Sequence, residues 1–250
     1  FSLGSREALI LTFDELTANN DYYQYTLIHC DYQWNKSDLQ PQEYLDGAFF
    51  EEIRDFKFSR NTFTQYVNYQ VRIPGNEMKP RISGNYILKV YRNFDESDVI
   101  LTRRFFVINP KVSISGEVKP ATLAEFRYNR QEVDFTVNTN KAIIPNPFQD
   151  AKVVVMQNFR TDNAKYNLVP LFINGSELIY NYESENVFER TNEFRFFDFR
   201  TLRNLSPNIR RKDKDEQNNT WLTLYTDELR GYQRYVFWND FNGKMVIENK

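Results

Sequence analysis

The chain has 250 residues, of which 41% are hydrophobic and 26% charged, so it is globular rather than disordered and long enough for two domains of about 100 to 150 residues each. Its 32 basic and 34 acidic residues give a formal net charge of −2, which excludes an overall field that would attract nucleic acid or an anionic membrane. The high aromatic content, 16% with 22 Phe and 16 Tyr, favours β-structure, because these side chains pack well on a half-buried pleated surface.

Five segments before residue 109 are predicted to be strands, namely residues 8–13, 22–30, 63–73, 86–91 and 99–108. The clearest is 63–73, because its apolar residues alternate onto one face, formed by Phe63, Val67, Tyr69, Val71 and Ile73. In 22–30, the residues Tyr23, Tyr25, Leu27 and His29 share a face in the same way. Turn-forming residues at 74–76 and 83–85 separate the strands on either side of them.

The chain leaves a strand at Asn109-Pro110, where we place a boundary between domains at 1–109 and 110–250. Beyond it, strands are predicted at residues 111–116, 133–137, 151–156, 194–199, 221–225 and 233–238. Asn174-Gly175 and Asn242-Gly243 indicate two-residue hairpin turns, since both central positions of such a turn need positive φ. The second of these hairpins would end in a strand at residues 244–247, close to the end of the chain.

Helical periodicity is scarce, and residues 39–53 and 120–128 are expected to be loops with a turn or two of helix. The mixed charges of residues 210–216 predict a solvated loop. The fold class is therefore all-β, with two consecutive immunoglobulin-like β-sandwich domains and an undetermined strand order. The disulfide typical of immunoglobulin domains is excluded by the single cysteine, Cys30.

Catalysis by a Ser-His-Asp or Cys-His arrangement would need the only histidine, His29, which is followed directly by Cys30. Adjacent residues of a strand point to opposite faces, so the two side chains are poorly placed to share a proton. We therefore expect His29 to have a structural role and the chain to be no enzyme. One cysteine and one histidine also exclude a zinc site of the common Cys-rich kind.

Other chemistry finds equally little support. Asp14-Glu15, Glu51-Glu52 and Asp198 are expected on turns and solvent faces rather than as the carboxylate pair of a glycosidase. The eight scattered glycines form no phosphate-binding loop, so no nucleotide cofactor is predicted. Residues 95–98 (Asp-Glu-Ser-Asp) are expected to be a plain turn rather than a weak site for a hard cation, so no metal or cofactor is predicted at all.

Tyrosine and tryptophan in excess can also build a flat platform for sugars, because their rings bury area and keep a polar tip. The candidates are Tyr22, Tyr32, Trp34, Tyr44, Tyr66, Trp221, Tyr232 and Trp238. The same rings could instead fill two sandwich cores or contact another protein. All three uses stay open at this point.

Several segments, in this order and spacing, resemble one known family. They are His29-Cys-Asp-Tyr-Gln-Trp34, Tyr44-Leu-Asp-Gly47, Phe58-Ser-Arg-Asn-Thr62, Ile73-Pro-Gly-Asn-Glu-Met-Lys-Pro80, Ser83-Gly-Asn-Tyr-Ile-Leu-Lys-Val90, Leu101-Thr-Arg-Arg-Phe105 and Asn192-Glu-Phe-Arg-Phe-Phe-Asp-Phe-Arg-Thr-Leu-Arg203. The sequence resembles the type IX secretion system plug protein family of Bacteroidetes, formerly a domain of unknown function.

The resemblance implies a periplasmic, non-enzymatic β-sandwich protein that is associated with the outer membrane without inserting into it. Its partner would be the outer-membrane translocon barrel, whose periplasmic side it closes. It also implies a longer natural chain, with a signal peptide and a strand segment before Phe1 and further strands after Ile247, so that the second domain is truncated at its C-terminus. The alternative from a different class is a carbohydrate-binding β-sandwich module, and neither hypothesis identifies interface residues.

Overall fold

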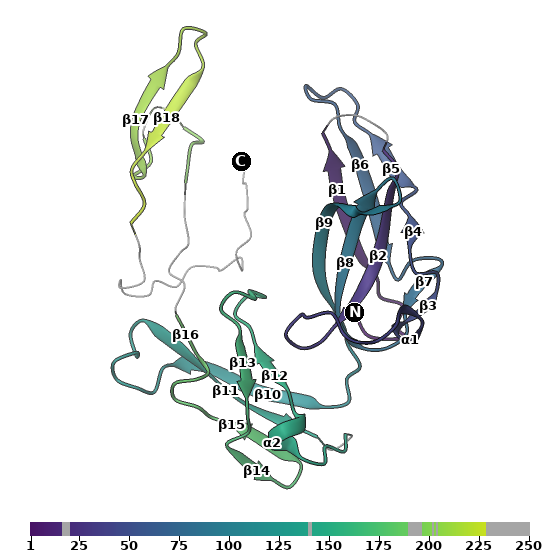
Figure 1. The fold of residues 1–250 in the computed structure, drawn as a ribbon. Coiled ribbons are helices and arrows are strands. Elements are labelled where there is room, and N and C mark those ends of the chain that lie inside the picture. Colours follow the sequence, from purple (N-terminus) through teal and green to yellow (C-terminus); the bar gives the residue numbers. More distant parts are fainter. Residues whose placement is uncertain (17–20, 140–141, 190–196, 202, 204, 229–250) are drawn as a thin grey trace. The chain divides into compact units, whose positions relative to one another are not determined.

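A computed structural model describes residues 1–16, 21–139, 142–189, 197–201, 203 and 205–228 of the chain (Figure 1). In this part, regular structure is almost entirely strand, with two one-turn helices, α1 (Pro41–Tyr44) and α2 (Pro147–Asp150). The all-β prediction is therefore confirmed. The chain divides into two compact units, Phe1–Lys111 and Val112–Lys250, and the boundary expected after residue 109 lies two residues before this division.

The first unit consists of two antiparallel sheets that enclose a core. One sheet has the strand order β1 (Leu9–Glu15), β6 (Val67–Ile73) and β5 (Asp55–Phe58). The other has the order β4 (Glu51–Glu52), β2 (Tyr23–Cys30), β8 (Gly84–Arg92) and β9 (Asp95–Val107), and Figure 1 shows β2, β8 and β9 side by side. A short pair, β3 (Leu45–Gly47) and β7 (Met78–Pro80), follows α1.

The alternation read from the sequence places the core of the first unit correctly. In β6, Val67, Tyr69, Val71 and Ile73 are buried, as predicted, and β2 and β8 contribute Tyr23, Tyr25, Leu27, Tyr86, Leu88 and Val90. The rings of Tyr23 and Tyr69 meet edge to face across the two sheets, with centroids 4.8 Å apart. Phe63 was predicted on this face, which is wrong, because β6 begins only at Val67 and Phe63 is fully exposed before it.

The strand connections of the first unit are those of an immunoglobulin-like sandwich. In that nomenclature β1, β6 and β5 take the places of strands B, E and D, and β4, β2, β8 and β9 those of C′, C, F and G. Near the start of β8, the Tyr86 hydroxyl donates a hydrogen bond to the carbonyl of Ile82 at 2.9 Å, which is the tyrosine corner of this fold. Leu88, two residues later, is buried where immunoglobulin domains carry a disulfide cysteine.

The hairpin between β8 and β9 corrects one prediction. Residues 95–98 were expected to form a turn, but β9 already begins at Asp95. The turn is instead made by Asn93 and Phe94, which both have positive φ (55° and 60°) between the paired residues Arg92 and Asp95. This is the geometry of a type I′ hairpin, which asparagine tolerates but a bulky phenylalanine disfavours.

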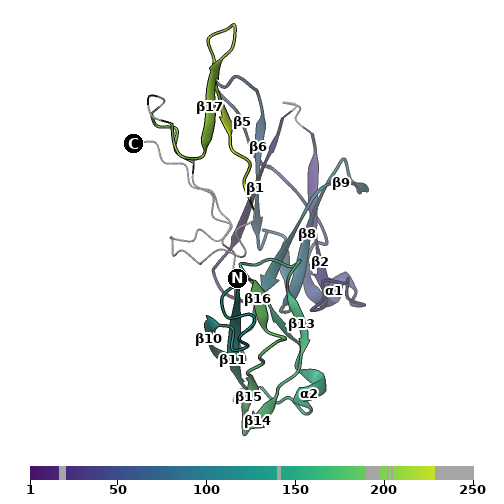
Figure 2. The same cartoon turned by 90° about the vertical axis from the view of Figure 1, so that its left-hand side faces the viewer.

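The second unit contains a larger sheet and two small ones, all antiparallel (Figure 2). The larger sheet has the order β10 (Ser113–Pro120), β11 (Arg130–Asn138), β15 (Glu177–Tyr180) and β14 (Phe172–Asn174), with β16 (Val187–Glu189) also paired to β11. The small sheets are β12 (Val153–Val155) with β13 (Lys165–Leu168), and β17 (Ile209–Lys214) with β18 (Thr220–Leu224). The strands predicted from 111–116, 133–137, 151–156 and 221–225 are all present with shifted ends.

The core of the second unit lies between the larger sheet and the β12–β13 pair. Its buried members are Phe135, Val137, Leu168, Leu178 and Tyr180, with Val153 and Val155 partly buried against them. Phe135 and Tyr180 are cross-strand partners whose rings stack with centroids 4.6 Å apart. Among the described residues, this core has fewer buried members than that of the first unit.

Three expectations for the second unit are corrected. The loop predicted at 210–216 is wrong, because β17 pairs with β18 and its exposed charged residues lie on a strand that is solvated on both faces. The Asn174-Gly175 hairpin is present, but its two central residues are Gly175 and Ser176, and Gly175 has the positive φ. Residues 121–128 contain turns and no helix.

Some predicted strands cannot be compared with the structure. Residues 194–196 of the strand predicted at 194–199, all of 233–238 and the hairpin at Asn242-Gly243 with its strand 244–247 lie outside the described residues, and residues 197–199 are not in a strand.

Candidate interaction surfaces

The single histidine occupies a structural position. His29 lies on the core face of β2, with Nδ1 2.9 Å from the Ser37 hydroxyl oxygen and its ring edge-to-face against Tyr86. Burial lowers the pKa of His29, and a hydrogen bond to the Ser83 backbone opposes that shift only in part. Gly84 leaves room for the imidazole, because a Cβ at that position would lie 2.3 Å from Nε2.

Cys30 faces away from His29, as the strand alternation predicts. Its thiol is buried, and burial followed by the charge of Asp31 raises the pKa of Cys30. A buried thiol with a raised pKa is a poor nucleophile. The two residues therefore form no catalytic pair.

The acidic residues named from the sequence are mostly engaged within the fold. Glu51 joins β4 to the turn before β7, because Oε1 accepts the backbone N–H groups of Glu77 and Met78, both at 2.5 Å, and Oε2 accepts the Tyr25 hydroxyl at 2.8 Å. Glu15 accepts the Tyr23 hydroxyl at 2.5 Å.

The remaining candidate carboxylates have local partners. Asp14 accepts from the Asn68 amide at 2.7 Å, Glu52 pairs with Arg54 at 3.1 Å, and Asp198 pairs with Arg200 at 2.7 Å. In the segment 95–98, Asp95 accepts from Ser97, and Asp98 pairs with Arg92 at 2.9 Å. Within the described residues, no group of three or more His, Cys, Asp or Glu side chains is arranged to hold a metal ion.

Within either unit, the aromatic candidates with described positions do not form one exposed platform. Trp34 and Tyr44 are buried, and Trp34 packs on Phe106 and beneath the Arg104 guanidinium. Tyr22 and Trp221 are the strongly exposed rings among the candidates with described positions, and they belong to different units. Tyr32 and Tyr66 are half-buried, while Tyr232 and Trp238 lie outside the described residues. The carbohydrate-binding alternative therefore finds no support.

An exposed aromatic patch lies at the tip of the β8–β9 hairpin. Phe94 is 62% exposed and meets Phe50 edge to face at 6.2 Å, and the backbone N–H of Asn93 donates to the carbonyl of the exposed Tyr22 at 2.8 Å. Gln24 is fully buried and stabilises the turn, because its side-chain oxygen accepts a hydrogen bond from the Phe94 N–H at 2.7 Å. We call Tyr22, Phe50 and Phe94 the aromatic tip; exposed aromatic clusters of this kind are typical of protein contact surfaces.

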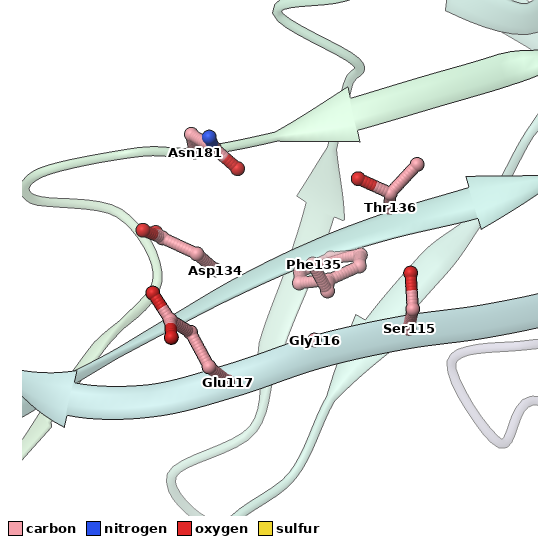
Figure 3. Close-up of a pocket in the computed structure, with 7 residues that line it drawn as sticks. All are labelled: Ser115, Gly116, Glu117, Asp134, Phe135, Thr136 and Asn181. Atoms are coloured by element: carbon pink, nitrogen blue, oxygen red, sulfur yellow. The ribbon is translucent and has the colours of Figure 1, made fainter.

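The second unit carries a polar groove on the face of its larger sheet that points away from the core. The groove has a volume of about 360 Å³ and is lined by Ser115, Gly116, Glu117, Asp134, Phe135, Thr136 and Asn181. Figure 3 shows the carboxylates of Glu117 and Asp134 on the same side of the sheet, and these residues are direct cross-strand partners. These two carboxylates make the groove acidic, and like charges in such positions repel each other.

A buried ionic network adjoins this groove. The Lys119 ammonium group contacts both Asp134 and Glu132, the latter at 3.1 Å, and Glu132 also accepts the Thr122 backbone N–H at 2.8 Å and its hydroxyl at 3.1 Å. Burial of Glu132 opposes its ionisation, but the bonds from Thr122 and Lys119 outweigh burial and lower the pKa of Glu132. Hydrogen bonds to Asp134 and Glu132 raise the pKa of Lys119. Glu132 is therefore held ionised beside the ammonium group of Lys119.

Sequence reasoning missed both surfaces. Asn93-Phe94 is no standard hairpin signal, because the second central position of a type I′ turn usually holds glycine. The groove depends on the register that sets Glu117 opposite Asp134, and register is a long-range property that the sequence alone does not display.

Comparisons with known proteins give the following matches. The family described as the type 9 secretion system plug protein 1st domain matches residues 1–109. No curated protein matched the chain. Among solved structures, the chain is similar to the crystal structure of a hypothetical protein from Parabacteroides merdae, with 30% identity and a TM-score of 0.85. The match covers 100% of this chain and 63% of that one, so the chain spans less than two thirds of that protein.

Proposed function

We propose that this chain is part of a plug that binds the outer-membrane translocon of the type 9 secretion system, because residues 1–109 match the family described as the type 9 secretion system plug protein 1st domain. In this proposal the protein lies in the periplasm, is associated with the outer membrane and closes the periplasmic side of the translocon. The family match over 1–109 is the observation that carries the proposal. The role is a binding role, without catalysis.

The domain organisation is part of the proposal. The residues matched by the family form most of the first compact unit, and this unit has an immunoglobulin-like sandwich of its own. We assign residues 1–109 and 110–250 to two consecutive domains, of which the second has its own smaller core around Phe135 and Tyr180.

The chemistry of the surface supports binding. The rings of the aromatic tip are exposed to solvent. A partner that covers them would gain about 25 cal/mol for each Å² of apolar surface removed from water. The residues that could have carried catalysis are engaged elsewhere, since His29 packs between tyrosines and Glu51 accepts three hydrogen bonds within the fold. No described helix is both long and apolar enough to cross a membrane.

The test is a chemical crosslinking pull-down of the tagged full-length protein from membranes of its own organism, with partners identified by mass spectrometry. We expect a large outer-membrane barrel protein to be the main partner. A matched preparation in which Phe94 is replaced by Ser, a side chain that cannot bury comparable apolar area, reports whether the aromatic tip contributes to capture. Reproducible absence of the barrel from a secretion-competent strain would refute the proposal, and recovery of glycan-processing proteins instead would restore the carbohydrate alternative.

A further inference from the structure

The outer edge of β10 has no paired strand in the part of the chain that the structure describes. Among the described strands, β10 pairs only with β11, in one unbroken register from Ser113 opposite Asn138 to Pro120 opposite Gln131. The N–H of Ala121 donates to the carbonyl of Arg130, and hydrogen-bonded pairs recur at every second residue of an antiparallel ladder. The backbone groups of Ser115, Glu117 and Lys119 therefore point to β11, and those of Ile114, Gly116 and Val118 point outward.

The side chains of β10 give this edge two different faces. Ile114, Gly116 and Val118 lie on the core side of the sheet, yet Ile114 is 68% and Val118 64% exposed. Ser115, Glu117 and Lys119 lie on the opposite face, beside the acidic groove. An added strand would meet apolar side chains on one face and acidic ones on the other.

The usual protections against strand addition are weak along β10. Natural edges are guarded by outward-pointing lysines, bulges or proline. Here Lys119 is drawn over β11 by Glu132 and Asp134, and the register has no shift. Pro120 blocks one outward N–H position, but only at the end of the strand. Within the described residues, no strand pairs with the outer edge of β10 along the seven residues before Pro120.

The charged side chains on the groove face indicate which kind of strand could pair with β10. On the groove face, the Lys119 ammonium group contacts the carboxylates of Glu132 and Asp134, and Glu117 lies opposite Asp134 on the neighbouring strand. Arg130 also lies on this face, but its guanidinium is held by Glu189 and the Phe126 ring. Glu117 is exposed at the edge, where a basic side chain of a neighbouring strand would lie next to it.

We propose that β10 binds an extended segment of a partner polypeptide, in which basic and apolar side chains alternate. The segment adds a strand to the sheet by bonding to the backbone of Ile114, Gly116 and Val118. Its basic side chains lie in the groove beside Glu117 and Asp134, and its apolar side chains cover Ile114 and Val118. This inference concerns the second unit, outside the residues matched by the family, and does not rest on the secretion assignment.

The experiment uses the whole chain and a synthetic peptide of alternating lysine and valine, capped at both ends and as long as the eight residues of β10. Binding is measured by fluorescence anisotropy at low salt, and amide hydrogen exchange locates the bound peptide. We expect exchange of the Ile114, Gly116 and Val118 amides to slow when the peptide binds. A peptide with glutamate in place of lysine should bind at least about tenfold more weakly, because several like charges then meet in the groove.

Two variants separate backbone pairing from charge. Val118→Pro removes one outward N–H without touching the ladder to β11, a position that edge strands tolerate, and should reduce affinity about tenfold or more. Val118→Thr, which keeps the N–H, is its matched control. Glu117→Gln keeps the shape of the groove and should weaken binding about two- to fivefold.

Several results would overturn the proposal. If the three amides are already protected in the protein without peptide, the edge is covered within the protein itself. If Val118→Pro binds as well as Val118→Thr, the peptide does not add to this edge. Equal binding of the lysine and glutamate peptides would remove the charge argument. Failure here leaves the plug assignment untouched, because the pull-down with the translocon does not use this peptide.

Discussion

The two units are stabilised in different ways. Among the described residues, the first buries sixteen core side chains between two sheets, whereas the second buries five around Phe135 and Tyr180. The second unit instead holds an ionic network, with Glu132 almost completely buried beside Lys119. Apolar packing is insensitive to pH, and a buried ion pair is not. The comparison teaches that, within the described residues, the first unit has the larger apolar core, while the stability of the second is expected to depend on pH.

The largest expected effect tests the apolar core of the first unit. Leu88→Ala removes a side chain that is 1% exposed between the two sheets, and such truncations cost about 2–5 kcal/mol of unfolding free energy. Hydrogen exchange of the β2 and β8 amides under native conditions measures it. Ile10→Ala, at an exposed position of β1, should change that free energy by less than about 0.5 kcal/mol. Similar values for the two variants would mean that the core assignment is wrong.

The next effect tests the ionic network of the second unit. Lys119→Met keeps the length of the side chain but leaves Glu132 and Asp134 without their ammonium partner. Because Lys119 is itself partly exposed, we expect a loss of about 1–3 kcal/mol, below that of a fully buried pair. Denaturant unfolding followed by exchange of the β11 amides measures it. Lys57→Met on the exposed edge strand β5 is the control and should be nearly neutral.

The pH dependence separates the units further. The pKa of Glu132 is lower in the folded protein than its ordinary value of 4.5, so its ionisation stabilises the second unit above that pH. This contribution is lost as the pH falls through the folded pKa. Exchange of the β11 amides should therefore accelerate on acidification more steeply than that of the β8 amides, after correction for intrinsic rates. In Glu132→Gln the excess acid sensitivity should disappear; its persistence would assign it to another group.

The smallest expected effect is an increase in stability, whereas the substitutions above lower it. Phe94 has a φ of 60°, a conformation that costs a bulky residue about 1 kcal/mol or more and costs glycine nothing. Phe94→Gly should therefore stabilise the first unit by about 1 kcal/mol, less whatever the contact with Phe50 contributes. Asn93→Gly is the matched control and should change stability by only a few tenths, because asparagine already tolerates positive φ. Destabilisation by Phe94→Gly would show that the ring serves the fold rather than a contact.

The sequence predicts local features of this fold well. Alternation in residues 67–73 identifies the buried face of β6, since period two is a property of the strand itself. Prediction from alternation fails where pairing with residues far away in the sequence decides whether a segment is a strand. The charged residues of β17 form a strand only because β18 pairs with them, and Phe63 is exposed because the strand begins later than its pattern suggests.

The surfaces were harder to predict than the core. His29 and Cys30 were correctly separated by the alternation of β2, a local argument. Glu117 and Asp134 come together only through the register of β10 on β11, and Phe94 is displayed by an unusual turn. Buried aromatics such as Trp34 and Tyr44 could not be told from exposed ones by composition.

The most direct test of the proposed function is binding between this chain, purified in full, and the purified outer-membrane translocon barrel of the same organism, measured by surface-immobilised kinetics. The plug assignment of residues 1–109 predicts saturable binding that is weakened by Phe94→Ser at the aromatic tip and not by Lys57→Met on β5. No binding to an intact barrel, with the chain shown to be folded by its β8 amide protection, would contradict it.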